Sequence, residues 1–194
     1  MRIDALFILN SILFGVGLAM DAFSVSLANG LNEPDMKKPR MFLIAGTFCF
    51  FQIAMPLIGW LCVHTVAEKF TAFQKFIPWI ALILLLYIGG KMLIEGLKSK
   101  GEAESVAAVG IGELMIQGVA TSIDALSVGF TISEYSFPEA LLEALIIGAV
   151  TLLICIGGLL IGKKFGTKLA GKASILGGVI LILIGIEIFV KGIF

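Results

Sequence analysis

The sequence predicts an all-α integral membrane protein whose six transmembrane helices form two inverted three-helix repeats. Three observations predict this fold. Of the 194 residues, 59% are hydrophobic and 14% are charged, whereas soluble domains carry about 25% charged residues. The apolar residues form long continuous runs and not the alternating pattern of membrane β-strands. The residues around an aspartate in the first run recur around a second aspartate in the fourth.

Each apolar run is long enough to cross about 30 Å of hydrocarbon as a helix. The first run contains Asp21 and lacks a small-residue cleavage site, so we expect a retained span and not a signal peptide. A polar linker at 99–107 divides the single transmembrane domain, 1–194, into repeat one at 1–98 and repeat two at 108–194. The predicted spans are 5–29, 41–66, 77–97, 108–132, 138–162 and 173–194.

The basic residues near the ends of the spans predict the direction of the chain. The loops after the first, third and fifth spans carry most of them, so we expect these loops in the cytoplasm and both termini outside. The basic residues of these loops are Lys37, Lys38, Arg40, Lys98, Lys100, Lys163, Lys164, Lys168 and Lys172, against Arg2, Lys69, Lys75 and Lys191 on the other side.

Alignments between the two halves extend the repeat beyond the aspartates. Because each half has an odd number of spans, the two halves are expected to enter the membrane from opposite faces, which is the plan of many transporters. The alternative is that apolar helices merely look alike. The aligned sets are Met20–Ser26 with Ile123–Gly129; Ala45, Cys49, Gln52, Pro56 and Gly59 with Ala144, Gly148, Thr151, Cys155 and Gly158; and Ile88, Gly89 and Gly96 with Ile184, Gly185 and Gly192.

The two aspartates are the first candidates for a functional site. A charged residue inside a span costs about 2.5–3.5 kcal/mol on insertion scales and is a functional candidate by default. Helical spacing puts small and hydroxyl residues on the same faces, so the carboxylates are expected to face protein and not lipid. Carboxylate and hydroxyl oxygens suit Mn²⁺, Mg²⁺ or Ca²⁺. Alternatively, each aspartate is a packing or capping residue. The two faces are Gly17, Asp21, Ser24 and Ala28, and Ala120, Asp124, Ser127 and Thr131, with Thr121 and Ser122 adjacent.

Gln52 is the third candidate, because Pro56 removes the backbone donor that would otherwise bond the Gln52 carbonyl. That carbonyl is then available to an ion or water, although a kink in which Gln52 bonds a neighbouring helix explains the pattern equally well. Thr151 is the repeat partner of Gln52. Straight helices would place the two aspartates roughly 12 Å apart in depth. One compact site therefore needs tilted or broken helices, and Asn29-Gly30 and Gly129 would permit irregular backbone.

Other ionisable residues are candidates for gating or proton coupling. Lys91 and Glu95 are four residues apart, as are Glu187 and Lys191, so each pair can also neutralise itself within one helix. Glu143 has no basic partner in sequence and could line a vestibule. The only histidine, His64, is either a boundary residue or a pH-sensitive residue near the outer face.

Several function classes are not expected. The sequence lacks a phosphate loop, a paired-cysteine motif and a Ser/His/Asp pattern, so neither an enzyme nor a bound cofactor is predicted. The net charge is zero, which predicts no nucleic-acid partner. The inside-negative potential opposes cation export by about 2.3 kcal/mol per charge per 100 mV. An exporter of a divalent cation therefore needs high internal metal or exchange for protons.

Five short stretches carry a resemblance to a known family: Met20–Phe23, Pro56–Trp60, Gly89–Gly96, Ala120–Ala125 and Ile175–Gly178. Together they resemble the manganese efflux pump family (MntP), a branch of the lysine-exporter superfamily. The resemblance covers essentially the whole chain, and its motifs fall in the matching spans and order.

The resemblance implies a multi-pass protein of the bacterial inner membrane that exports Mn²⁺ as its transported substrate. The family's two membrane aspartates match Asp21 and Asp124. The polar position before the Pro-Leu-Ile-Gly-Trp stretch matches Gln52, which is glutamate in some members, and the neutral amide lowers the charge of the site. Glu143 matches no family motif.

The sequence thus predicts a Mn²⁺ exporter that binds its substrate on two intramembrane aspartates and works by rocking one half against the other. One alternative is an exporter of another solute, such as another divalent metal or an amino acid. The other is a membrane scaffold without transport. The lipid bilayer is the expected surrounding, and the sequence does not indicate an oligomeric state. The remaining predicted ligands are Gln52, Ser24, Thr121, Ser122, Ser127 and Thr151.

Overall fold

A computed structural model describes residues 5–65, 77–98, 109–169 and 173–193. Every regular element in these ranges is an α-helix. Continuous apolar composition favours helices here, because a helix satisfies its own backbone hydrogen bonds in hydrocarbon. The helices are α1 (Ala5–Asn32), α2 (Lys38–Thr65), α4 (Ile77–Lys98), α5 (Ile111–Ala120), α6 (Ile123–Thr131), α7 (Phe137–Leu169) and α8 (Ala173–Ile193).

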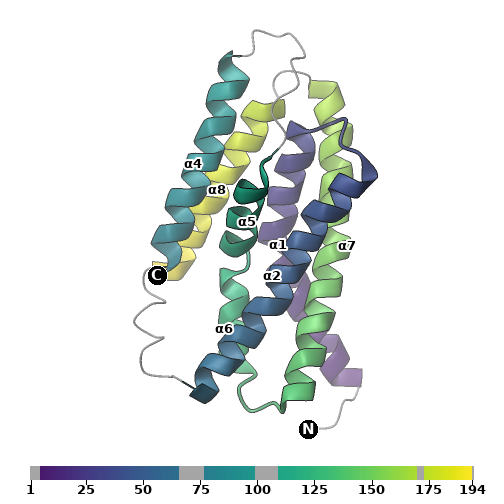
Figure 1. The fold of residues 1–194 in the computed structure, drawn as a ribbon, viewed down its shortest axis with the longest axis vertical. Coiled ribbons are helices and arrows are strands. Elements are labelled where there is room, and N and C mark those ends of the chain that lie inside the picture. Colours follow the sequence, from purple (N-terminus) through teal and green to yellow (C-terminus); the bar gives the residue numbers. More distant parts are fainter. Residues whose placement is uncertain (1–4, 66–76, 99–108, 170–172, 194) are drawn as a thin grey trace.

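The helices run up and down along the long axis of the molecule (Figure 1). Each of the six predicted spans is helical, and α5 and α6 share the fourth. Among the described residues, four segments are long and apolar enough to cross a membrane, and a shorter apolar stretch lies in α8. The chain is therefore a multi-pass membrane protein. The four segments are Ala5–Asn32, Lys38–Val63, Ile111–Thr131 and Phe137–Gly166, and the shorter one is Ile175–Glu187.

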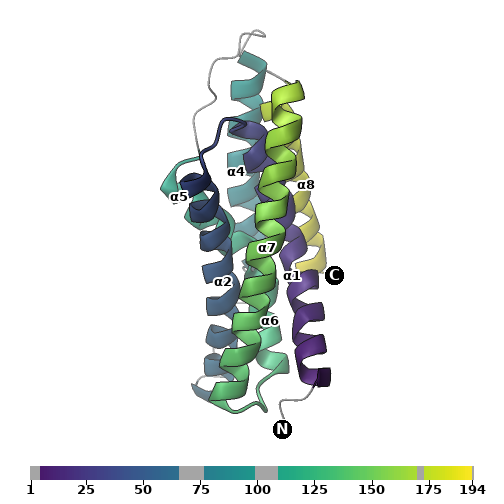
Figure 2. The ribbon, with the colours of Figure 1, turned by 90° about the vertical axis from the view of Figure 1, so that its right-hand side faces the viewer.

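The two ends of the bundle differ in charge. We call the end where α1 ends and α2 begins the upper end, and the end where α6 ends and α7 begins the lower end (Figures 1 and 2). The upper end carries Lys37, Lys38 and Arg40 around the start of α2, and Lys163 and Lys164 near the end of α7. The described basic residues of the first and fifth loops, which the sequence predicts to be cytoplasmic, thus lie at the same end.

The fourth predicted span is broken at Thr121 and Ser122, which separate α5 from α6. The Thr121 hydroxyl donates to the Gln117 carbonyl (2.9 Å) and the Ser122 hydroxyl to the Gly118 carbonyl (2.7 Å). A hydroxyl that donates to the carbonyl four residues earlier competes with the backbone N–H for that carbonyl and often bends the helix. The break therefore lies at two predicted site residues.

The irregular backbone does not lie at the glycines that would permit it. α1 continues through Asn29-Gly30 to Asn32, and Gly129 lies inside α6. Gly129 instead allows α6 to approach α2, since a Cβ there would lie 2.3 Å from the Pro56 carbonyl oxygen. Across the same contact, a Cβ on Gly59 would lie 2.2 Å from the Leu126 carbonyl oxygen. Small residues permit such close helix contacts in membranes.

α7 approaches α1 in a similar way. A Cβ on Gly158 would lie 2.8 Å from the Phe23 carbonyl oxygen and 3.2 Å from the Ser26 Cβ. α4 and α8 form a further close pair, in which Gly89 and Gly178 each lie against the carbonyl of the other. These contacts leave α1, α2, α6 and α7 tightly packed around the centre of the bundle.

Two groups of buried apolar side chains fill the interior. The larger one includes Ile44, Phe48 and Leu159 and packs α1, α2, α5 and α7 together with α4 and α8. The smaller one, which we call the lower core, joins α1, α6 and α7 toward the lower end. The buried members of the lower core are Leu18, Ala125, Val128, Ile132, Ala140 and Ile147.

Candidate cation-binding site

Gln52 of α2 is fully buried where α1 and the broken helix meet. Its amide nitrogen donates to two backbone carbonyl oxygens, that of Leu18 in α1 and that of Thr121 at the break, each at 3.1 Å. Leu18 precedes Asp21 by three residues, and Thr121 precedes Asp124 by three. One side chain thus joins the two segments that carry the aspartates.

The amide oxygen of Gln52 is buried and has no hydrogen-bond partner. The hydroxyl oxygen of Thr151 in α7, which the predicted repeat aligns with Gln52, is likewise buried without a partner. Buried polar atoms nearly always have partners, so unpaired ones need an explanation such as an absent ion or water. Two oxygen acceptors are therefore available in the interior.

Thr121 and Ser122 add hydroxyl oxygens at the break, and both residues are buried. Their protons are used in bonds to α5 carbonyls. A hydroxyl that donates its proton still has lone pairs that can accept a bond or bind a cation. The Thr121 and Ser122 hydroxyl oxygens therefore lie between two helices, in a segment without regular helical backbone.

The two aspartates lie at more open positions than Gln52. Asp21 is partly exposed in the middle of α1, and Asp124 is exposed in the first turn of α6. An Asp124 carboxylate oxygen accepts the Ala125 N–H at 2.9 Å. The first turn of a helix favours negative charge because its N–H groups are unpaired. The break therefore creates a helix start that stabilises the Asp124 carboxylate.

The hydroxyl residues Ser24, Ser127 and Thr131 are about as exposed as the aspartate near each of them. The Ser24 hydroxyl donates to the Met20 carbonyl at 3.0 Å. Ser127 and Thr131 are exposed on the same side of α6 as Asp124, and the Thr131 hydroxyl donates to the Ser127 carbonyl at 3.3 Å. Within the described ranges, no three His, Cys, Asp or Glu side chains cluster as a metal site. A cation here would rely on two carboxylates and neutral oxygens.

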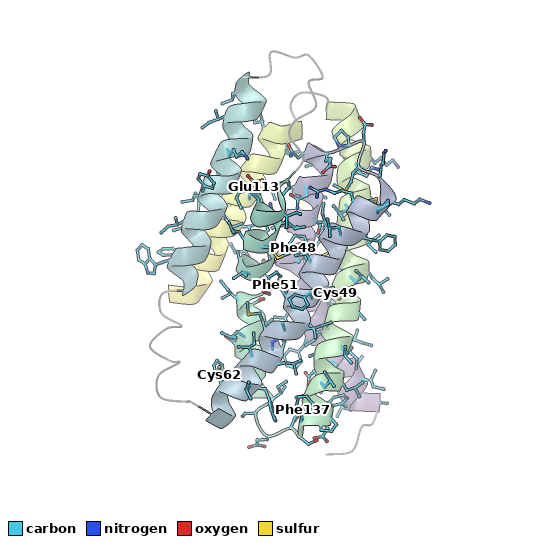
Figure 3. All side chains as sticks on the ribbon, in the orientation of Figure 1. Phe48, Cys49, Phe51, Cys62, Glu113 and Phe137 are labelled. Carbon is cyan, nitrogen blue, oxygen red and sulfur yellow. The ribbon has the colours of Figure 1, made fainter. Side chains whose placement is uncertain are left out.

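The predicted gating residues Lys91 and Glu187 are both exposed. Lys91 of α4 forms an ion pair with Glu113 of α5. The side chain of Glu95 is outside the described residues. Glu187 is exposed on α8. Figure 3 labels Glu113 on α5, beside α4.

A buried amide pair that the sequence analysis did not predict joins α1 to α5. The Asn29 amide nitrogen donates to the Gln117 side-chain oxygen at 2.8 Å, and the Gln117 amide nitrogen donates back to Asn29 at 3.3 Å. Both side chains are fully buried. The sequence signal was present, since each is an amide inside an apolar helix, but the partner could not be identified from it.

Other contacts hold α5 and the first loop at the upper end. Arg40 forms an ion pair with Glu33 (3.4 Å) and donates to the Val109 carbonyl, just ahead of α5. Phe51 of α2 packs against α5, so that a Cβ on Gly118 would lie 2.3 Å from its ring (Figure 3). α5 is thus fastened to α1, α2 and α4 between the break and the upper end.

Comparison with known proteins gives one consistent result. Residues 35–189 match the model of a family described as "Putative manganese efflux pump". A protein named "Putative manganese efflux pump MntP" from Ruminiclostridium cellulolyticum is 39% identical over 94% of this chain and 95% of its own length. Proteins with that name from Methanobrevibacter smithii and Methanospirillum hungatei are 41% and 40% identical, over 93% and 95% of this chain and 96% and 94% of their own lengths. No solved structure matches.

Proposed function

We propose that this chain, which belongs to the manganese efflux pump family, exports Mn²⁺ from the cytoplasm through a site on Asp21 and Asp124. Family membership supports the substrate and the direction, because the relatives are named for manganese efflux. It also supports a transporter and not an enzyme. The residues that bind the ion are argued from the geometry.

The position of Gln52 is the main observation in support of this cation site. Its amide nitrogen bonds the carbonyl three residues before each aspartate, and its amide oxygen is buried without a partner. Mn²⁺ prefers oxygen ligands, and carboxylates with neutral carbonyl or hydroxyl oxygens are its common set. We propose that Asp21 and Asp124 supply charge and that the Gln52 oxygen completes the site. The hydroxyls of Ser24, Thr121, Ser122, Ser127 and Thr151 are further ligands in this proposal.

We further propose that residues 1–98 and 108–194 are inverted repeats. The close contacts recur at the offsets of the sequence repeat. Gly59 lies against the Leu126 carbonyl, and Gly158 lies against the Phe23 carbonyl. Gly158 follows Gly59 by 99 positions, and Leu126 follows Phe23 by 103 positions. The two carbonyls that Gln52 bonds, Leu18 and Thr121, are also 103 positions apart. Recurring contacts of this kind are expected when two halves share one fold.

In this proposal the upper end faces the cytoplasm and is closed in the present structure. The Asn29–Gln117 amide pair and the Lys91–Glu113 ion pair join α5 to its neighbours between the break and the upper end. Mn²⁺ from the cytoplasm reaches Gln52 only after α5 moves away from α1 and α4. The break at Thr121 and Ser122 lets α5 move without α6.

The test is manganese accumulation in cells that lack their own exporter. Cells carrying the wild-type chain are expected to hold less Mn²⁺, measured by elemental analysis, than cells with an empty vector. Asp21→Asn and Asp124→Asn are expected to abolish this effect at equal expression, because the amide removes the charge that binds the ion. Asp35→Asn, on an exposed residue of the first loop, is the matched control and is expected to behave as wild type.

Two results would contradict the proposal in different ways. If the wild-type chain leaves cellular Mn²⁺ unchanged, the substrate is wrong, and other divalent metals and amino acids become the candidates. If it lowers Mn²⁺ and both aspartate variants do so too, the two carboxylates are packing residues and the ion binds elsewhere.

A further inference from the structure

Glu143 is a buried acid that the proposed site does not use. It lies in α7 with 1% of its surface exposed, and its Oε2 atom has no hydrogen-bond partner. On the helix it shares a face with Ala140 and Ile147, three residues before and four residues after it. Both of these belong to the lower core, so the carboxyl group points into an apolar interior.

Tyr135 lies within electrostatic reach of Glu143. Burial raises the pKa of Tyr135 above its ordinary value, and Glu143 and then Glu139 raise it further whenever they are ionised. The Tyr135 ring lies 5.8 Å from that of Phe7, and its carbonyl accepts the Trp60 indole N–H at 3.0 Å. Tyr135, which contacts Phe7 and Trp60, is therefore the nearby polar residue that responds to the charge of Glu143.

The helices packed around Glu143 offer it no described cation. The charged residues of α1 and α6 in the described ranges are the acids Asp21 and Asp124. Glu139, one turn earlier on α7, is also an acid and accepts bonds from the Ser136 N–H and hydroxyl. The described basic side chains of α2 and α7 are at the upper end, and the His64 side chain is outside the described residues.

An ionised carboxylate in apolar surroundings is unstable unless it gains a proton or a cation. A divalent metal ion takes six or more oxygen ligands, whereas Glu143 belongs to no cluster of acids, histidines or cysteines in the described part of the chain. A single carboxyl group is, however, sufficient to bind one proton. The surroundings thus favour a proton over a metal ion.

We propose that Glu143 is the proton-coupling residue of this exporter, which binds a proton from the lower side and releases it on the opposite side as Mn²⁺ leaves the cytoplasm. This inference rests on the proposed function. In the closed form Glu143 holds the proton on its carboxyl group. When the lower core opens, water from the lower side reaches the carboxyl group and a proton binds. When α5 moves and the upper end opens, water from the upper side reaches the carboxyl group and the proton leaves. One positive charge then moves inward for each Mn²⁺ that moves outward, which offsets part of the electrical cost of export.

The experiment uses the purified full chain in proteoliposomes with a Mn²⁺-sensitive dye inside. Two rates are measured: net Mn²⁺ movement driven by an imposed pH gradient, and exchange of radioactive for unlabelled Mn²⁺ without a gradient. Glu143→Gln keeps the shape of the side chain but cannot release a proton. The expected result is loss of gradient-driven movement to the protein-free background, with exchange retained. Glu139→Gln, the neighbouring acid, is the control and is expected to retain both rates.

Each other outcome overturns the inference. Gradient-driven movement by Glu143→Gln at the wild-type rate means that the coupling proton binds elsewhere. Loss of exchange as well, in a variant that remains monodisperse in detergent, means that Glu143 serves metal binding or structure and not coupling. If the wild-type chain itself shows no Mn²⁺ exchange, the proposed function fails, and the role of Glu143 fails with it.

Discussion

At the scale of single residues, the interior of this protein depends on a few amide side chains. Gln52 joins two helices through two carbonyls, and Asn29 and Gln117 join two helices through each other. Amides are suited to this because one group both donates and accepts without adding charge. They connect segments that apolar side chains alone would leave free to slide.

Removing one member of the Asn29–Gln117 pair leaves the other buried and unpaired. We expect Asn29→Ala and Gln117→Ala each to lower the free energy of unfolding by about 1–3 kcal/mol. The double variant Asn29→Ala/Gln117→Ala is expected to lose less than the two single variants summed, because no orphaned amide remains. Unfolding in detergent, followed by circular dichroism, measures all three variants. Strict additivity would show that the two amides do not depend on each other.

At the scale of helices, the sequence predicts where the chain is helical but not where it is irregular. The six apolar runs all contain helices, because length and composition are sufficient to identify them. The break was not located, since Thr121 and Ser122 inside an apolar run are compatible with a continuous helix as well. Gly129 was considered as a point of irregular backbone, and it proves to be a contact point instead.

The same limit applies to side-chain partners. The spacing of Lys91 and Glu95 predicts one partner for Lys91, but its partner Glu113 becomes a neighbour only through the packing of α5 on α4. Asn29 and Gln117 are separated by 88 positions. A pattern within one helix reports on that helix, but it carries no information about which helix packs against it. Asp21, Asp124 and Gln52 can be identified as candidates from the sequence because placing an acid or an amide in the middle of a span costs free energy whatever its partners are.

The close approach of α2 and α6 leads to a prediction about helix packing. Gly129→Ala places a methyl group where the Pro56 carbonyl lies 2.3 Å away, so we expect lower thermal stability in detergent and lower expression. The cost of overpacking is typically about 1–3 kcal/mol. The control is Gly46→Ala on α2, whose added methyl meets no atom within 4 Å. Gly46→Ala is expected to be neutral or slightly stabilising. Equal stability of the two variants would show that α2 and α6 are not in tight contact.

At the scale of the whole molecule, the distribution of charge gives the two ends different roles. The upper end carries the described basic residues at 37–40 and 163–164 and holds α5, while the lower end encloses Glu143 in an apolar core. Basic loops remain in the cytoplasm during insertion. The upper end is therefore expected inside the cell, in the cytoplasmic membrane, with both termini outside.

Labelling from one side of the membrane tests this orientation. In a background where Cys49, Cys62 and Cys155 are replaced by serine, Ser136→Cys marks the lower end and Lys164→Cys marks the upper end. A membrane-impermeant maleimide is expected to label Ser136→Cys in intact cells stripped of their wall, and Lys164→Cys only after permeabilisation. The reverse pattern would invert the direction of transport that we propose.

In the repeat that we propose, the counterpart of the break in the fourth span is an unbroken stretch of α1. The positions that match Thr121 and Ser122 are Leu18 and Ala19, which lie inside α1 and carry no hydroxyl to bend it. If the two halves exchanged conformations during transport, α1 would have to bend at Leu18 and Ala19, where no hydroxyl side chain favours a bend. The inward-open and outward-open forms should therefore differ in energy. Without a bound ion, the protein would mostly occupy the form of lower energy. Binding of the transported ion would then have to supply the energy difference between the two forms.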